Sequence, residues 1–164
     1  MTTRTFALVL GIILLIVGIA GFIPGLTVHH VPDTGMAPGD ATAAPTATVA
    51  ASYGYLLGIF PVNVLHNLFH IAWGIFGIVA YRSLGGATGF ARSTAIVYAV
   101  LTVLGLVPAG LSTVWGLLPL FGNDIWLHAL IALAGAYFGW VHNRNEALAT
   151  DTATVSGAAA TRRS

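Results

Sequence analysis

Cysteine and lysine are both absent from this 164-residue chain, and charged residues make up only 7% of it. The absence of cysteine excludes disulfide bonds, thiolate metal ligands and cysteine nucleophiles. Soluble domains usually carry about 25% charged residues, so the low charge argues against a soluble protein. The formal net charge of +1 offers no basic surface for nucleic acid. Hydrophobic residues account for 57% of the chain, and this composition predicts one integral membrane domain in a lipid bilayer.

Four apolar stretches approach the length of roughly 20 residues that a membrane-spanning helix needs. The first is longer than the apolar region of a signal peptide, which has about 7–15 residues, so we expect it to be retained. Pro61 is expected in the first turn of the second helix, and residues 82–92 are expected to form a short turn. We therefore predict an all-α membrane protein, a bundle of four transmembrane helices in residues 1–142. The predicted spans are residues 5–23, 61–81, 93–111 and 124–142.

The segments between the spans differ in composition and in charge. Residues 25–52 are a low-complexity Ala/Thr/Pro-rich stretch that predicts a flexible loop, and residues 53–60 are expected at the membrane interface. Residues 143–164 predict a disordered tail. All six arginines lie on the side of the termini and the 82–92 turn. The positive-inside rule then predicts a multi-pass protein of the cell (cytoplasmic) membrane with both termini in the cytoplasm.

A short pattern recurs along the chain, with a glycine, two apolar residues and a proline. It starts at Gly21, Gly58, Gly105 and Gly116. In addition, Leu65-His66 matches Leu127-His128 and Phe76-Gly77 matches Phe138-Gly139 at the same offset along the chain. We interpret the chain as two pseudo-repeated helical hairpins related by an axis along the membrane normal.

Polar residues gather on one face of the second predicted span. Asn63, His66, Asn67 and His70 recur at i, i+3 and i+4 spacing. Asp124 and His128 lie one turn apart at the start of the fourth span, where the carboxylate is placed to orient the imidazole. We expect all six to meet at one depth, in the outer half of the membrane, and to face the bundle interior.

Three interpretations of this cluster stay open. The first is a structural hydrogen-bond network that includes Asn63 and Asn67, ties spans two and four together, and serves a structural or partner-binding membrane subunit, with another membrane protein or a second copy as partner. The second is a zinc or copper site with His66, His70, Asp124 and His128 as ligands. The third is a haem b held by His128 with His66 or His70. The first is our main expectation, with no catalytic residue assigned. A redox protein using the same histidines is the alternative.

The run from Gly58 to His70, with its Pro-x-Asn-x-x-His-Asn-x-x-His pattern, and the run Asn123–His128 together resemble a known family. It is a bacterial family of small four-span membrane proteins catalogued as domain of unknown function 4383. The resemblance covers about residues 5–142 and implies a four-helix membrane protein without an established activity. The topology is also similar to that of the DoxX-like proteins, at the level of the fold alone.

Overall fold

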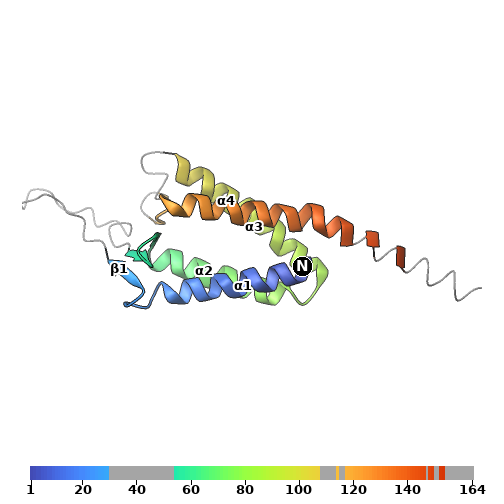
Figure 1. Cartoon of the computed structure of the whole chain (residues 1–164), viewed down its shortest axis with the longest axis horizontal. Coiled ribbons are helices and arrows are strands. Elements are labelled where there is room, and N and C mark those ends of the chain that lie inside the picture. The colour runs from blue at the N-terminus through green and yellow to red at the C-terminus, as the bar shows by residue number, and fades with distance from the viewer. Residues whose placement is uncertain (30–53, 108–113, 115–116, 147, 150–151, 154–164) are drawn as a thin grey trace, which may run out of the picture.

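A computed structural model describes residues 1–29, 54–107, 114, 117–146, 148–149 and 152–153. Within these residues the chain is mostly helical, and four α-helices run side by side along the molecule (Figure 1). Their bounds are α1 Thr3–Ala20, α2 Val64–Ala80, α3 Leu84–Leu106 and α4 Asn123–Ala136. A π-helical segment, η3, follows α4 at Tyr137–His142.

The helices pack as two pairs. α1 lies along α2, and α3 lies along α4 (Figure 1). Small residues allow each pair to come close. A Cβ atom on Gly11 of α1 would lie 2.8 Å from the carbonyl oxygen of Gly74 in α2, and one on Gly135 of α4 would lie 2.8 Å from that of Ala91 in α3. This agrees with the role of small residues in bringing membrane helices together.

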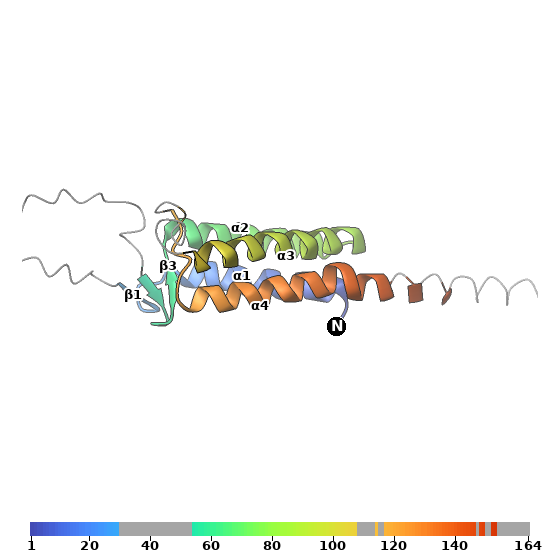
Figure 2. The same cartoon turned by 90° about the horizontal axis from the view of Figure 1, so that it is seen from above.

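A small antiparallel sheet lies at one end of the bundle, which we call the sheet end. The N-terminus lies at the opposite, terminal end (Figure 2). The strands are β1 Thr27–His29, β2 Gly54–Leu56 and β3 Phe60–Val62, in the order β1-β2-β3. The all-α prediction did not include this sheet. The hairpin between β2 and β3 forms because Leu57 and Gly58 adopt positive φ angles of 54° and 71°, which is the backbone of a type I′ turn.

The start of the second helix was predicted three residues too early. Pro61 belongs to β3, an edge strand of the sheet, where a missing N–H is tolerated. α2 begins at Val64 because the side chain of Asn63 accepts a hydrogen bond from the backbone N–H of His66 at 2.8 Å. A side-chain oxygen at this position satisfies one of the free amides of the first turn.

The prediction that residues 82–92 form a turn was wrong. α3 already begins at Leu84, since the Ser83 hydroxyl caps it by accepting from the N–H of Gly86 at 3.0 Å. Gly86 also lies close to the end of α2, where a Cβ atom would be 2.7 Å from the carbonyl oxygen of Ala80. Gly86 therefore allows the helix to begin close to α2. Gly85 and Gly89, which have open space around them, do not break the helix.

Helical structure at the end of the fourth span continues beyond the predicted limit. Residues 143–146, which the prediction assigned to a disordered tail, continue the helix past η3. The carboxylate of Glu146 accepts from the N–H of Thr3, with distances of 3.3 and 3.2 Å to its two oxygens. This contact connects the last helix to the first turn of α1, where a negative charge is favourable.

Several predicted features have no counterpart that the structure can describe. Most of the predicted loop 25–52, including His30, and Pro108 and Gly116 of the recurring pattern lie outside the described residues. The other glycines of the pattern have different backbone settings. Gly21 caps α1, Gly58 lies in the hairpin turn and Gly105 lies inside α3. The internal repeat thus remains a prediction.

Three helices are long and apolar enough to cross a membrane, namely Thr3–Ala20, Leu84–Leu106 and Asn123–Glu146. α2 is apolar too, but it has 17 residues and is shorter. Large aliphatic side chains project outward from all four helices, and most of the buried polar side chains lie between them. This distribution is typical of a membrane protein. Examples of the exposed side chains are Ile16, Val79, Val103 and Leu133.

Candidate functional site

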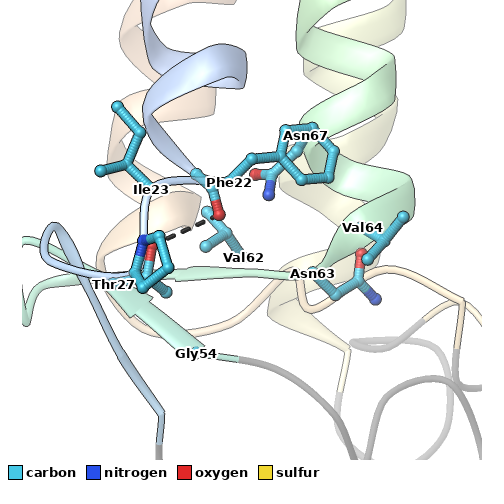
Figure 3. A pocket seen from close by; sticks show the side chains of 10 residues that line it. Phe22, Ile23, Thr27, Gly54, Val62, Asn63, Val64 and Asn67 are labelled. Atoms are coloured by element: carbon cyan, nitrogen blue, oxygen red, sulfur yellow. Dashed lines mark hydrogen bonds between the residues drawn. The ribbon is translucent and has the colours of Figure 1, made fainter.

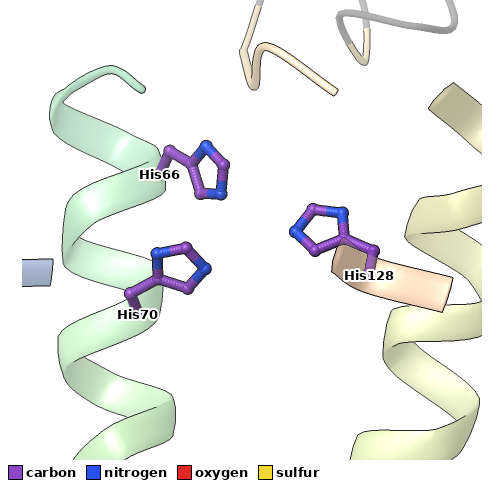
Figure 4. Close-up of side chains that lie close together, drawn as sticks. All are labelled: His66, His70 and His128. Atoms are coloured by element: carbon purple, nitrogen blue, oxygen red, sulfur yellow. The ribbon is translucent and has the colours of Figure 1, made fainter. Parts of the chain in front are cut away.

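Three histidines meet between α2 and α4 near the sheet end. His66 and His70 project from successive turns of α2 towards His128 of α4 (Figure 4). One nitrogen from each ring belongs to a set in which all atoms lie within 4.8 Å of one another. The ring centres of His66 and His70 are 4.5 Å apart, and those of His66 and His128 are 5.9 Å apart. The three side chains are 1–5% exposed, so the protein itself surrounds them.

Asn63 holds the first histidine in place. Its side-chain oxygen accepts a hydrogen bond from the backbone N–H of His66 and so caps the first turn of α2. Its side-chain nitrogen donates to the backbone carbonyl oxygen of Leu117 at 2.8 Å. Leu117 lies in the connection that leads into α4. The single buried Asn63 side chain therefore fixes the start of α2 relative to the segment before α4. The predicted network was expected to include Asn63 and to join spans two and four, whereas this bond reaches the connection before α4.

Asp124 approaches His66 from the opposite helix. Its Oδ2 atom lies 3.6 Å from the Nδ1 atom of His66, and both side chains are almost completely buried. The sequence predicted this carboxylate in the first turn of the fourth span, which the structure confirms. It was expected to orient His128 on its own helix, but the contact that forms is with His66 across the bundle. This placement leaves the Nε2 atom of His66 as the nitrogen facing away from the acid.

Tyr98 of α3 is part of the site and was missed in the sequence. Its side chain is fully buried, and its ring meets that of His128 nearly edge-on, with centres 5.2 Å apart. Phe69 and Trp73 of α2 continue this aromatic wall, stacked with centres 5.3 Å apart. Interfacial tyrosines gather at the ends of membrane helices. A tyrosine inside an apolar span was the signal that could have identified it.

The site contains an unusual number of buried polar atoms without a hydrogen-bond partner in the described part of the chain. Each such atom costs about 1–3 kcal/mol when it is left unsatisfied. Six buried side-chain atoms are in this state, and five of them belong to the site. These five are Nδ1 of His66, His70 and His128, Oη of Tyr98 and Oδ2 of Asp124.

A metal ion fits this arrangement better than a haem does. A tetrahedral ion with bonds of about 2.0–2.1 Å holds its nitrogen ligands about 3.3–3.4 Å apart. The three ring nitrogens are within 4.8 Å of one another, so side-chain shifts of roughly 1 Å would bring them to this separation. Pockets for cofactors usually have volumes of about 300–1,000 Å³. The cavity that the structure describes beside His70 and Asp124 has about 100 Å³. The described residues thus provide a space suited to an ion but not to a macrocycle.

Asn67 lies apart from the histidines, although it shares the buried side of α2. Its side chain packs against Gly21 at the end of α1, and its Oδ1 atom is the sixth buried atom without a partner among the described residues. It lines a cavity of about 170 Å³ between α1, α2 and the sheet, beside which the hydroxyl of Thr27 donates to the carbonyl oxygen of Gly21 (Figure 3). Asn63 and Asn67 therefore serve different contacts.

The other two described histidines, His29 and His142, lie on other elements. His29 forms the end of β1. His142 lies at the terminal end, where its Nε2 atom is 3.5 Å from Glu146. Neither is a member of the three-histidine set.

No curated protein and no solved structure matches the chain significantly. One family model does match, and its match covers residues 4–141, which include α2, α3, α4, all of α1 but its first residue, and the three-histidine cluster. The resemblance seen in the sequence is thereby confirmed over most of the chain. The protein belongs to the family described as Domain of unknown function (DUF4383).

Proposed function

We propose that this protein is an integral membrane protein that holds a transition-metal ion, zinc or copper, between α2 and α4. The observation that supports this proposal most directly is the group of three buried imidazoles whose ligand atoms lie within 4.8 Å of one another. Imidazole nitrogens suit both metals. The chain contains no cysteine, so histidine is the strongest ligand type for these metals that it offers.

The roles of the four residues differ. His66, His70 and His128 are the ligands. Asp124 is not a ligand in this proposal but supports one, because its Oδ2 atom faces the Nδ1 atom of His66. Ligand histidines typically donate their second ring N–H to a carboxylate, which fixes the tautomer and the ring orientation. The burial of the three imidazoles supports the proposal, because buried polar rings need a partner and a bound ion would give each ring one.

We further propose four membrane spans, two pseudo-symmetric hairpins, and a cytoplasmic terminal end. Pairing of α1 with α2 and of α3 with α4 supports the hairpins. α2 is apolar and lies along α1, and 17 residues are at the lower limit of the usual range for a span. Three arginines lie nearer the terminal end of the bundle than the sheet end, which supports a cytoplasmic location for the terminal end. They are Arg4, Arg82 and Arg92. The histidine site then lies in the outer half of the bilayer.

A second candidate is a structural or partner-binding membrane subunit without a metal. The contact from Asn63 to Leu117 favours it, because this bond connects two parts of the bundle without a ligand. Polar contacts between membrane helices commonly hold bundles together in this way. The partner would be another membrane protein or a second copy of the chain.

Metal titration of the purified, chelator-treated protein separates the two candidates. We expect one Zn²⁺ or Cu²⁺ ion per chain, and cobalt as a spectroscopic substitute should give visible bands typical of tetrahedral nitrogen ligation. His128→Ala should weaken binding by at least about tenfold, the scale found even for residues one step outside a metal site. His142→Ala is the matched control and should bind normally. A protein that takes up no metal, and loses only thermal stability in His128→Ala, would support the structural candidate.

A further inference from the structure

A cavity of about 100 Å³ adjoins the histidine site on the side of α1. It lies where α1, the sheet, the second turn of α2 and the first turns of α4 meet. Its polar wall consists of two residues of the site, His70 and Asp124, and each carries a buried atom without a partner among the described residues. Its other walls are apolar. They include Val17, Leu56, Val62 and Leu127.

The size and lining of this space restrict what it can hold. Apolar cavities inside proteins tend to stay free of water, and one of about 150 Å³ binds molecules as large as benzene or xenon. A space of about 100 Å³ accommodates a molecule of a few atoms. Aliphatic side chains favour a neutral molecule over an ion, because they cannot replace the hydration of a charge.

The proposed metal site has a free coordination position that could bind such a molecule. Three protein ligands with a fourth position left free are the usual arrangement of a zinc site that acts on a substrate, whereas structural sites have four protein ligands. The ligand set here contains three histidines. Asp124 is not a member of this set, although its Oδ2 atom lies 3.6 Å from the Nδ1 atom of His66.

We propose that a copper ion at His66, His70 and His128 keeps one coordination position open towards this cavity, and that in the copper(I) state this position binds a neutral diatomic molecule such as dioxygen, nitric oxide or carbon monoxide. This inference rests on the proposed metal-binding function. The size and the aliphatic walls of the cavity favour a small, uncharged ligand, and the metal ion forms the coordinate bond to that ligand. Val17 and Leu127 are two of its aliphatic walls.

Carbon monoxide binding to the copper(I)-loaded protein tests the proposal. Copper(I) with three imidazole ligands binds CO at its fourth position. The bound CO has an infrared stretching band that is shifted from that of the free gas. We expect one CO per copper. Val17→Phe fills the cavity from α1 and should lower CO affinity at least tenfold, with copper affinity changed less than about twofold. Leu127→Phe, from α4, is the second variant in case the first does not fold.

The control is Val9→Phe, which makes the same change on the exposed side of α1, away from the cavity. It should bind CO as the original protein does. A copper-loaded protein without a CO band, or equal CO affinity in all three variants, would overturn the open position while the metal site stands. Absence of any copper binding would overturn the metal site and the open position together.

Discussion

Asp124 and His66 face each other across the bundle, with 3.6 Å between Oδ2 of the acid and Nδ1 of the imidazole. The two side chains come from α4 and α2, and both are enclosed by protein. This separation is longer than a hydrogen bond, and neither atom has a hydrogen-bond partner among the described residues.

Asp124→Asn should weaken metal binding without abolishing it. An amide is nearly the same size as the carboxylate but lacks its charge, so it holds the imidazole less firmly. Residues one step outside a metal site typically contribute 10–100-fold to affinity. We expect a loss in this range, measured by competition with a metal-sensitive dye. A loss as large as that of His128→Ala would instead indicate that Asp124 is itself a ligand.

Asn63→Ala should destabilise the protein more than the loss of an ordinary helix cap. The change removes the cap of α2, worth about 0.5–2 kcal/mol. It also removes the donor to Leu117, worth about 0.5–1.5 kcal/mol. Asn63→Ser keeps a capping oxygen and should lose only the second contribution. Unfolding in detergent measures both, with Ser83→Ala as a control for the loss of a cap alone. Equal stability of the Ala and Ser variants would contradict the double role.

Two glycine-to-alanine changes should have opposite effects on stability. A Cβ atom at Gly74 would lie 2.6 Å from the backbone nitrogen of Leu15, so Gly74→Ala forces α1 and α2 apart. We expect a loss of about 1–3 kcal/mol, the range for overpacking. Gly89 in α3 has open space around it, and Gly89→Ala should stabilise the helix by about 0.5–1 kcal/mol. Thermal unfolding of the two variants side by side checks the pair. A neutral Gly74→Ala would show that the helices are less closely packed than described.

Reporter fusions check the orientation of the spans. A reporter at residue 164 should give a cytoplasmic signal, and one inserted within residues 30–50 should give an external signal. An even number of spans places the two termini on one side, and the arginines place that side in the cytoplasm. Signals from the same side at both positions would show that the number of spans or their direction differs.

The histidine site could be anticipated because its determinants are local. The spacing of His66 and His70 places both on one side of a helix in any structure that keeps the helix. His128 required only that α4 face α2. Tyr98 was missed because its participation depends on how α3 is rotated within the bundle, and no local pattern specifies that rotation.

The errors along the backbone have similar causes. The strands have three residues each, too few for an alternating pattern, and β1 pairs with β2 across a long stretch of intervening chain. Glycines 85, 86 and 89 resembled a turn because glycine disfavours a helix. Here the Ser83 cap and the close contact with α2 outweigh that preference.

The π-helical segment Tyr137–His142 has a consequence for the length of the chain. A π-helical stretch accommodates a residue more than an α-helix in the same span, and each residue of an α-helix turns the chain by about 100°. Deleting one residue here would restore a regular helix and leave everything after it in nearly the same angular position. The carboxylate of Glu146 would then still face the N–H of Thr3, as it does now. An α-helix that kept all of the residues would instead turn Glu146 away from Thr3, so the wider turn takes up one residue without moving the point at which the fourth helix meets the first.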